Sequence, residues 1–332
     1  MMDESTSAPY KECKSLVLIT GASRGIGRAI ALAIADTIQQ PRSGDTNDST
    51  APASALALSA PLHLVLIARS VESLRETSHL VEQRCGGSSV VVTTSCHEMD
   101  LSDLDTLSDK LTNLLEQLKS TNYDHCWLIN NAGSLGPLGL ASSLDSGASS
   151  LKAMQNAVDL NVTSGLWVSS QFAKTFLSPV DASSSLSKKC PVVRIVNISS
   201  LCAIEPFPTM AVYCAGKAAR DMFHSVLAKE NSPQTQAKTN TDNSDGDDGN
   251  TVVLISDPIP FKVLNYAPGA CDTKMTDVLA ECSVLDKSLH QFFSSSREEQ
   301  TLVKVEDTAK KLIGLLEKDK FQSGEHVDFW DV

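Results

Sequence analysis

The chain has 332 residues, and its 28 Lys and Arg against 40 Asp and Glu give a formal net charge of −12. This acidic balance excludes the basic surface expected of a protein that binds nucleic acid or an anionic membrane. No segment approaches the roughly 20 consecutive apolar residues of a membrane span, and the polar N-terminus lacks a secretory signal pattern, so a cytoplasmic protein is expected.

The nine cysteines contain no C-x-x-C pair and no regular spacing. This distribution argues against a disulfide framework and a zinc site, and no metal is predicted. Cys202 and Cys214 are interpreted as packing residues, and His326 is interpreted as structural rather than catalytic.

The first expected elements are a strand over residues 16–20 and a helix that opens near Arg24. Between them lies GASRGIG, in which Gly21, Gly25 and Gly27 allow a tight turn and a close approach of the backbone to a pyrophosphate. The free N–H groups and the positive end of the helix dipole favour such an anion. The motif therefore predicts a nucleotide site; the alternative is a glycine turn that binds no ligand.

The second expected strand, residues 62–68, is followed by Arg69 and Ser70. An enzyme that prefers NAD usually carries an acidic residue near this point, which binds the ribose 2′-hydroxyl. Here the guanidinium groups of Arg69 and Arg24 and the hydroxyl of Ser70 suit a 2′-phosphate, because the arginine fork matches phosphate oxygens. The pattern predicts NADPH/NADP+ as the cofactor, unless either arginine simply faces solvent.

Five further expected strands lie at residues 90–95, 126–130, 192–198, 261–266 and 325–329. Many of the expected strands lack polar alternation, as strands covered on both faces do. Strands and helices alternate along the chain with one glycine motif, which predicts a single domain over residues 1–332 with its core at 14–332. The predicted fold class is α/β, a Rossmann-type doubly wound parallel sheet with helices on both faces.

Two polar segments, residues 39–61 and 231–260, interrupt this alternation. Both are rich in Ser, Thr, Asn, Asp, Gly and Pro, so they bury too little apolar surface to offset the entropy of ordering. We interpret them as flexible surface insertions.

Three residues in the second half of the chain predict a catalytic group. Ser200 follows an expected strand, Tyr213 comes 13 residues later, and Lys217 follows Tyr213 by four. Positions i and i+4 share one face of a helix. An ammonium beside a phenol favours the phenolate and lowers its pKa from about 10. With a serine hydroxyl to hold a carbonyl oxygen, the set suits ketone reduction, although a lone Y-x-x-x-K is usually only a helix surface.

Taken together, these motifs resemble the short-chain dehydrogenase/reductase family over nearly the whole chain. The matching segments are TGASRGIG at 20–27, Asp100 after the third strand, NNAG at 130–133, Asn161, Ser200, Tyr213 with Lys217, and PG at 268–269. None of these segments is specific alone, and their combination is highly specific.

The resemblance implies a role for each matching residue. Ser200 would orient the substrate carbonyl, Tyr213 would donate the proton, and Lys217 would bind the nicotinamide ribose and lower the pKa of the tyrosine. Asn161 would hold a water that links Lys217 to solvent. Besides Tyr213 and Lys217, the positions implied in cofactor binding are Gly21, Ser23, Arg24, Gly25, Ile26, Gly27, Arg69, Ser70, Asp100, Leu101, Asn131, Ala132, Gly133, Pro268, Gly269 and Thr273.

The resemblance also implies a substrate site made by Ser200, Leu201, Tyr213 and Asp328. SGEHVDF at 323–329 is similar to the segment in those family members that reduce pterin side-chain ketones in tetrahydrobiopterin synthesis, where this aspartate anchors the pterin. A carboxylate can accept hydrogen bonds from the adjacent N–H and amine of a pterin edge. The alternative is that Asp328 caps a turn or pairs with a surface lysine.

Three functions stay open at this point. The first is NADPH-dependent reduction of a pterin side-chain ketone, and the second is a reductase of diketones, quinones and other carbonyls with broad specificity. The third is a non-catalytic protein that senses NADPH and signals through its acidic insertion, against which the complete Asn–Ser–Tyr–Lys set argues. The resemblance further implies a homodimer, to which the apolar residues Met222, Phe223, Val226 and Leu227 could contribute.

Overall fold

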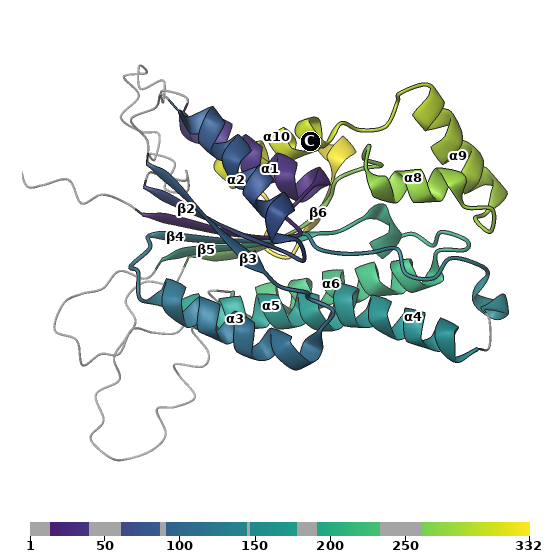
Figure 1. The fold of residues 1–332 in the computed structure, drawn as a ribbon, viewed down its shortest axis with the longest axis horizontal. Coiled ribbons are helices and arrows are strands. Elements are labelled where there is room, and N and C mark those ends of the chain that lie inside the picture. Colours follow the sequence, from purple (N-terminus) through teal and green to yellow (C-terminus); the bar gives the residue numbers. More distant parts are fainter. Residues whose placement is uncertain (1–13, 40–60, 87–90, 145–146, 178–190, 233–259) are drawn as a thin grey trace, which may run out of the picture.

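Seven segments form one parallel sheet in the order β3-β2-β1-β4-β5-β6-β7 (Figure 1). The computed structural model describes residues 14–39, 61–86, 91–144, 147–177, 191–232 and 260–332. The strands are β1 (Ser15–Thr20), β2 (Leu62–Ala68), β3 (Val92–Glu98), β4 (His125–Asn130), β5 (Val192–Ile198), β6 (Phe261–Ala267) and β7 (His326–Asp328).

Helices cover both faces of this sheet (Figure 1). One face carries α1 (Gly25–Gln39), α2 (Val71–Cys85) and α10 (Val305–Lys318), and the other carries α3 (Leu104–Lys119), α5 (Ser164–Leu177) and α6 (Ala211–Glu230). The remaining helices, α4 (Ala148–Val158), α8 (Lys274–Glu281) and α9 (Lys287–Glu298), lie toward the carboxyl ends of the strands. The predicted Rossmann-type parallel sheet with helices on both faces is therefore confirmed.

Every expected strand is present, and the third differs most in its bounds. The apolar run at residues 90–92 predicts a strand over 90–95, whereas pairing with β2 begins at Val92 and continues to Glu98. Strand β3 is at the edge of the sheet and only partly buried, so it tolerates the polar sequence TTSCHE. A prediction from apolar residues therefore ends strand β3 too early.

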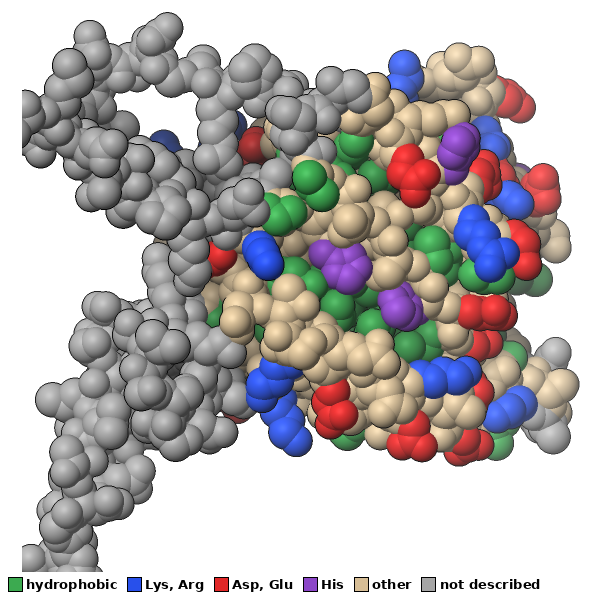
Figure 2. Space-filling model, turned by 60° about the vertical axis from the view of Figure 1, so that its left-hand side comes forward, with side chains coloured by type: hydrophobic (Ala, Val, Ile, Leu, Met, Phe, Trp, Pro, Cys, Tyr) green, Lys and Arg blue, Asp and Glu red, His purple; other side chains and the backbone are tan. Residues whose placement is uncertain are grey.

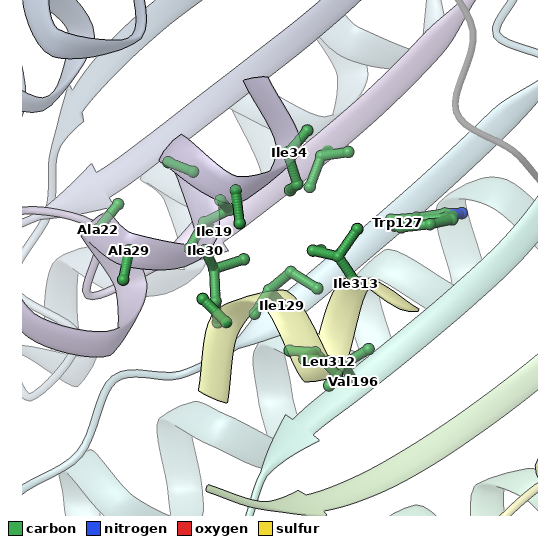
Figure 3. Close-up of a cluster of buried hydrophobic side chains, with 14 of the residues drawn as sticks. Ile19, Ala22, Ala29, Ile30, Ile34, Trp127, Ile129, Val196, Leu312 and Ile313 are labelled. Atoms are coloured by element: carbon green, nitrogen blue, oxygen red, sulfur yellow. The ribbon is translucent and has the colours of Figure 1, made fainter. Parts of the chain in front are cut away.

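Strand β1 shows why apolar runs without polar alternation form this sheet. Val17 and Ile19 point into one core cluster with α1 and α10, while Leu16 and Leu18 point into a second cluster with α3 and α5. Figure 3 shows the first cluster, in which side chains of α1 and α10 meet those of the central strands. Full burial of each such side chain contributes about 1.5–3 kcal/mol.

The order of the strands also fixes where a ligand can bind. Strand β1 lies between β2 and β4, so the winding of the chain reverses at this point. Open sheets of this kind bind ligands at the carboxyl ends of the strands beside such a reversal. The glycine motif, the NNAG segment and Ser200 all follow strands at this edge.

The two predicted insertions, 39–61 and 231–260, fall almost entirely outside the described residues. Within the described ranges, no helix is both long and apolar enough to cross a membrane. On the described part of the face drawn in Figure 2, acidic and basic side chains are interspersed rather than gathered into one basic surface.

Candidate active site

The glycine motif forms a tight turn between β1 and α1. Gly21 (φ 67°) and Gly25 (φ 55°) adopt the left-handed backbone conformation that favours glycine. A Cβ on Gly27 would lie 2.3 Å from the carbonyl oxygen of Gly21, so only glycine permits this close packing. The turn therefore presents bare backbone at the N-terminus of α1, a cradle that fits a pyrophosphate.

Arg28, which the sequence analysis did not identify, holds this turn in place. Its guanidinium donates to the carbonyl oxygen of Ser23 at 2.6 Å and to Thr77 Oγ1 at 3.0 Å. It also pairs with both carboxylate oxygens of Glu76, at 3.0 and 2.7 Å. Thr77 in turn donates to the carbonyl oxygen of Ala22 at 3.0 Å. Helix α2 thus supports the glycine turn from outside.

The residues predicted to recognise a 2′-phosphate lie at the ends of β1 and β2. Arg24 and Arg69 are exposed. Ser70 caps α2, since its Oγ accepts a hydrogen bond from the backbone N of Ser73 at 3.3 Å. Burial alone would raise the pKa of Asp100, but hydrogen bonds from the neighbouring serine and the charge of Arg69 lower it. The charge of Arg69 therefore reaches Asp100, and the hydroxyl of Ser70 already caps the helix.

The NNAG segment after β4 is bound to the end of β1. The amide nitrogen of Asn131 donates to the carbonyl oxygens of Thr20 and Gly21, at 3.0 and 3.2 Å. Thr20 Oγ1 accepts from the backbone N of Asn131 at 2.9 Å and of Ala132 at 3.0 Å. Asn131, Ala132 and Gly133 thus lie beside the glycine turn. Thr20, at the N-terminal edge of the motif, was not identified as functional from the sequence.

Ser200, Tyr213 and Lys217 come together beyond the carboxyl end of β5. Lys217 Nζ lies 5.6 Å from the centre of the Tyr213 ring and donates to the carbonyl oxygen of Ile198 at 2.7 Å. Ser200 caps the short helix η3 (Leu201–Ala203), and its hydroxyl is hydrogen-bonded to Tyr213. The predicted arrangement of phenol, ammonium and serine hydroxyl is therefore present.

Burial dominates the acidity of these groups. Burial raises the pKa of Tyr213 above its ordinary value, the nearby Cys202 adds to this, and the hydrogen bond from Ser200 opposes it. Burial, followed by the positive charge of Arg220, lowers the pKa of Lys217 to about 7. The predicted lowering of the Tyr213 pKa is therefore wrong for this structure, because desolvation outweighs the neighbouring charges. Burial also raises the pKa of Cys202 to about 12, as expected for a packing residue.

Asn161 lies in the π-helical turn η2 (Asp159–Thr163) that joins α4 to α5. Such turns are rare and occur frequently at functional sites. Its side-chain oxygen accepts from the backbone N of Ser134 at 2.8 Å, and its amide donates to the carbonyl oxygen of Ser134 at 2.7 Å. A Cβ on Gly133 would lie 3.1 Å from Asn161 Oδ1 and 4.0 Å from Lys217 Nζ. Gly133, Asn161 and Lys217 therefore lie close together. A water that links Lys217 to solvent through Asn161 stays a prediction.

Arg220 is a buried cation that the sequence analysis missed. It is fully buried, its Nε donates to Asn197 Oδ1 at 2.7 Å, and its terminal nitrogens donate to the carbonyl oxygens of Asn130 and Ala132. Its position three residues after Lys217 on α6 is the one signal in the sequence that could have placed it under the site. It ties the catalytic helix to the NNAG segment.

The segment after β6 borders the same edge of the sheet. Gly269 follows Pro268 with φ 77°, and a Cβ on Gly25 would lie 3.6 Å from Thr273 Cγ2. Thr273 caps α8, which packs with α9. Leu279 and Phe293 of this helix pair lie in one apolar cluster with Tyr213. The helices α8 and α9 thus pack over the tyrosine.

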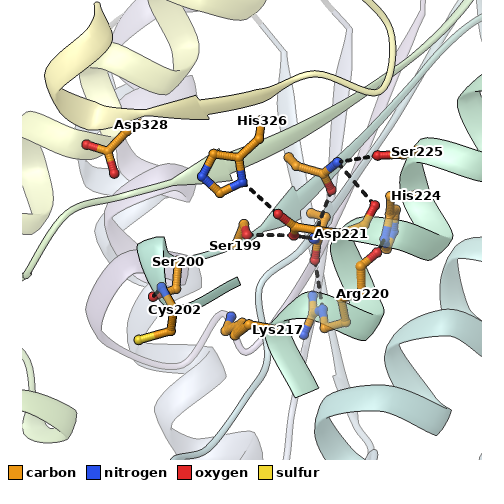
Figure 4. A network of polar contacts seen from close by, with 12 residues as sticks. Ser199, Ser200, Cys202, Lys217, Arg220, Asp221, His224, Ser225, His326 and Asp328 are labelled. Carbon is orange, nitrogen blue, oxygen red and sulfur yellow. Dashed lines mark hydrogen bonds and ion pairs between the residues drawn. The ribbon is translucent and has the colours of Figure 1, made fainter. Parts of the chain in front are cut away.

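Asp328 ends β7 and caps the short helix η4 (Phe329–Asp331). Its Oδ1 accepts from the backbone N of Trp330 at 3.0 Å, so the alternative that it caps a turn is correct. The backbone N of Asp331 also donates to this side chain, which completes a capping box. A carboxylate has about four lone-pair sites, so it can still accept a hydrogen bond from a ligand. Figure 4 shows Asp328 and His326 on the one strand, with Ser200 and Lys217 below them in the same view.

A cavity of about 670 Å³ lies beside this site. Mainly apolar residues line it, from the loop after β4, η1 (Ala141–Ser143), α4 and Val284. Leu138 of its lining also packs on the cluster that contains Tyr213. Within the described ranges, no group of three or more His, Cys, Asp and Glu side chains could hold a metal ion.

Comparison with known proteins agrees with this geometry. Residues 50–239 match the family model described as short chain dehydrogenase. A sepiapterin reductase from Rattus norvegicus is 33% identical over 320 residues, which is 96% of this chain and 97% of that protein. A benzil reductase ((S)-benzoin forming) from Bacillus subtilis is 27% identical and covers 91% of this chain and 93% of its own.

Among solved structures, the KRED1-Pglu enzyme aligns with a TM-score of 0.63 and 20% identity, over 94% of this chain and 100% of that one. A likeness at this identity bears on the fold alone, and it agrees with the doubly wound sheet described above.

Proposed function

The chain belongs to the short-chain dehydrogenase family, and we propose that it reduces the side-chain ketone of a pterin with NADPH, in tetrahydrobiopterin synthesis. As a member of that family it is an oxidoreductase of carbonyl and alcohol groups. The observation that carries the proposal is the convergence of Ser200, Tyr213 and Lys217 beside a strand that ends in Asp328. The similarity to sepiapterin reductase supports the choice of substrate.

The residues at the nucleotide site fit NADPH. The glycine turn offers bare backbone where a Cβ would clash, which suits the pyrophosphate, and Arg24 and Arg69 offer guanidinium groups for the 2′-phosphate. Asp100 and Leu101 would flank the adenine, and Thr273 would border the nicotinamide. When bound, NADPH supplies a hydride to the carbonyl carbon.

The protein's own residues handle the proton. Ser200 and Tyr213 hold the carbonyl oxygen between two hydroxyls, so the negative charge that develops on it is met by two donors. Tyr213 gives its proton to that oxygen, which yields the alcohol and leaves a phenolate. Lys217, whose pKa lies at about 7, can return a proton near neutrality. One hydride and one proton thus reduce one ketone.

Asp328 is the residue proposed to select a pterin. Strand alternation places its side chain on the same face of the sheet as His326, which faces α6. The carboxylate has lone pairs beyond those used in capping and can accept from the donor edge of a pterin, while the two capping bonds fix its orientation.

The second candidate is a reductase of diketones and other carbonyls with broad specificity. The apolar cavity beside the Tyr213 cluster favours it, since a bulky apolar substituent could lie there. The similarity to benzil reductase points in the same direction. A non-catalytic sensor remains less well supported, because the catalytic residues converge as a reductase needs.

A homodimer is also proposed, from exposed apolar side chains on α4, α5 and α6. Met222 is 67% exposed and Val226 is 45% exposed, one helical turn apart. Trp167 of α5 and Leu151 of α4 are exposed as well. Phe223 and Leu227 are instead half-buried against the chain's own core.

Asp328→Asn tests the substrate assignment. Asparagine can still cap η4, so the fold is kept while the charge is lost. We expect the KM for sepiapterin to rise about tenfold or more and the KM for benzil to change less than about twofold. Asp331→Asn is the matched control on the same segment. Equal effects of Asp328→Asn on both substrates would contradict the pterin assignment and favour the second candidate.

A further inference from the structure

A row of polar side chains crosses the sheet near the carboxyl ends of β4, β5 and β6. Asn130, Asn197, Asn265 and His326 are register partners on β4, β5, β6 and β7. Side chains in register point to the same face of a sheet, and here that face meets α6. Buried polar side chains on a sheet need hydrogen-bond partners. Helix α6 supplies them for Asn197, Asn265 and His326, whereas Asn130 donates to Gly165 and Ser169 of α5.

Asp221 of α6 is the partner at the end of this row (Figure 4). Its Oδ1 accepts from Asn197 Nδ2 at 2.9 Å and from Ser199 Oγ at 2.5 Å. Its Oδ2 lies 2.6 Å from His326 Nδ1. Because the carboxylate is an acceptor in all these contacts, His326 Nδ1 carries the hydrogen and donates it. Asp221 is only 8% exposed, so this is a shielded, charge-assisted hydrogen bond.

The bond from His326 to Asp221 is one of the contacts that hold strand β7 against α6. Ser225 Oγ of α6 also donates to the carbonyl oxygen of Gly324, just before the strand, at 3.0 Å. Strand β7 has three residues, lies at the edge of the sheet and pairs only with β6. Val327 anchors its other face in the apolar core, and Lys311 of α10 binds the carbonyl oxygen of Phe329 at 2.8 Å just beyond it. On the face toward the active site, the bond from His326 to Asp221 connects β7 to the helix that carries Tyr213 and Lys217.

This connection bears on substrate geometry. Asp328 follows His326 by two residues, so both side chains lie on that face, and Ala267 is the register partner of Asp328. The distance from Asp328 to the catalytic residues is therefore set by how β7 is held against α6. A carboxylate that binds one end of the substrate must lie at the right distance from the residues that hold the other end, so a small shift of the anchor weakens binding of the substrate.

We propose that the Asp221–His326 pair is a positioning device for substrate selection: it holds Asp328 at the distance from Tyr213 that a pterin requires. The pair contacts neither substrate nor cofactor in this account. This inference rests on the proposed function, because it assigns Asp328 as the anchor of the substrate.

Two substitutions of His326 separate positioning from bulk stability. His326→Asn places an amide N–H near the position of Nδ1 and can still donate to Asp221, whereas His326→Gln places its amide near Nε2 and cannot make that bond in the same way. Both remove the imidazole ring, so loss of packing is common to the two. The steady-state kinetics of both variants and of Asp328→Asn would be measured with sepiapterin and with benzil, together with their thermal unfolding and NADPH affinity.

We expect His326→Gln to raise the KM for sepiapterin roughly tenfold, with kcat within about twofold of the wild type. Benzil kinetics and NADPH affinity should stay unchanged, and His326→Asn should recover most of the lost affinity. Combining His326→Gln with Asp328→Asn should add little to the effect of Asp328→Asn alone, since the pair acts through that anchor.

The positioning proposal is overturned if His326→Gln alters sepiapterin and benzil kinetics alike, or if His326→Asn and His326→Gln have equal effects on the KM for sepiapterin. In either case, a selective effect of Asp328→Asn would leave the proposed function standing. If Asp328→Asn itself has no selective effect, the proposed function fails and the positioning role fails with it.

Discussion

Lys217 Nζ lies 5.6 Å from the centre of the Tyr213 ring, and its hydrogen bond to the backbone of β5 holds it there. Both side chains are buried, so neither exchanges protons freely with bulk water. The phenol is a poor acid until negative charge develops on a bound oxygen, and the amine can regain a proton near neutrality. This relation supports the proposal that Tyr213 donates the proton and that Lys217 returns a proton to it.

Removing the phenol hydroxyl should abolish most turnover. In Tyr213→Phe we expect kcat to fall at least about a hundredfold, since general acid catalysis contributes roughly 10²–10⁴ in rate. NADPH affinity, measured by quenching of protein fluorescence, should stay within a few-fold of the wild type. Turnover within a few-fold of the wild type would remove Tyr213 from the mechanism.

Replacing Lys217 should change how stability depends on pH. Its pKa is lowered from 10.5 to about 7, chiefly by burial. Between these values the unfolded chain binds a proton that the folded chain does not, so this group makes stability rise with pH across that window. The free energy of unfolding of Lys217→Met should therefore rise relative to that of the wild type as pH falls from about 10 to about 7. Unfolding by urea at several pH values measures this; a difference that does not vary with pH would contradict it.

His224 should contribute to acid unfolding. Burial lowers its pKa from 6.5 to about 4, and its ring nitrogens contact Ser169 Oγ and the carbonyl oxygen of Arg220 at 2.8 and 2.7 Å. A depressed pKa means stability that is present above pH 6.5 and is lost as pH falls toward 4. His224→Gln should be less stable than the wild type at pH 7, but its free energy of unfolding should decrease less than that of the wild type between pH 6.5 and 4. A parallel decline of both proteins over that range would refute the assignment.

Arg69 should determine the choice between the two nicotinamide cofactors. It is exposed at the end of β2 and its charge acts on Asp100. Arg69→Ala should weaken NADPH binding about tenfold or more and leave NADH binding nearly unchanged, because only NADPH carries the 2′-phosphate. Calorimetric titration of both cofactors checks this. Arg75→Ala, an exposed arginine on α2, is the control and should affect neither cofactor.

The fold and the central residues could be predicted because their signals are local. The glycine turn, the buried strands and the spacing of Tyr213 and Lys217 depend on neighbours within a few residues. By contrast, Arg220 and the partners of Asp221 could not be found this way. Arg220 binds carbonyl oxygens about 90 positions away, and Asp221 meets His326 across 105 positions. Only the register of the sheet brings such residues together.

The pKa values of Tyr213 and Lys217 were predicted least well, because they too depend on parts of the chain that are distant in the sequence. The sequence shows that an amine follows Tyr213 by four positions, but it does not show that both groups are almost completely removed from water. Desolvation then dominates the pKa shifts of both groups. Asp328 is a related case, since its role as a cap depends on a turn formed by the three residues that follow it.

The most direct test is NADPH oxidation by the purified protein with sepiapterin, compared with benzil and with each reaction repeated with NADH. We expect efficient reduction of sepiapterin with NADPH, weaker reduction of benzil, and little activity with NADH. Turnover of benzil with none of sepiapterin would contradict the pterin assignment and return Asp328 to a structural role.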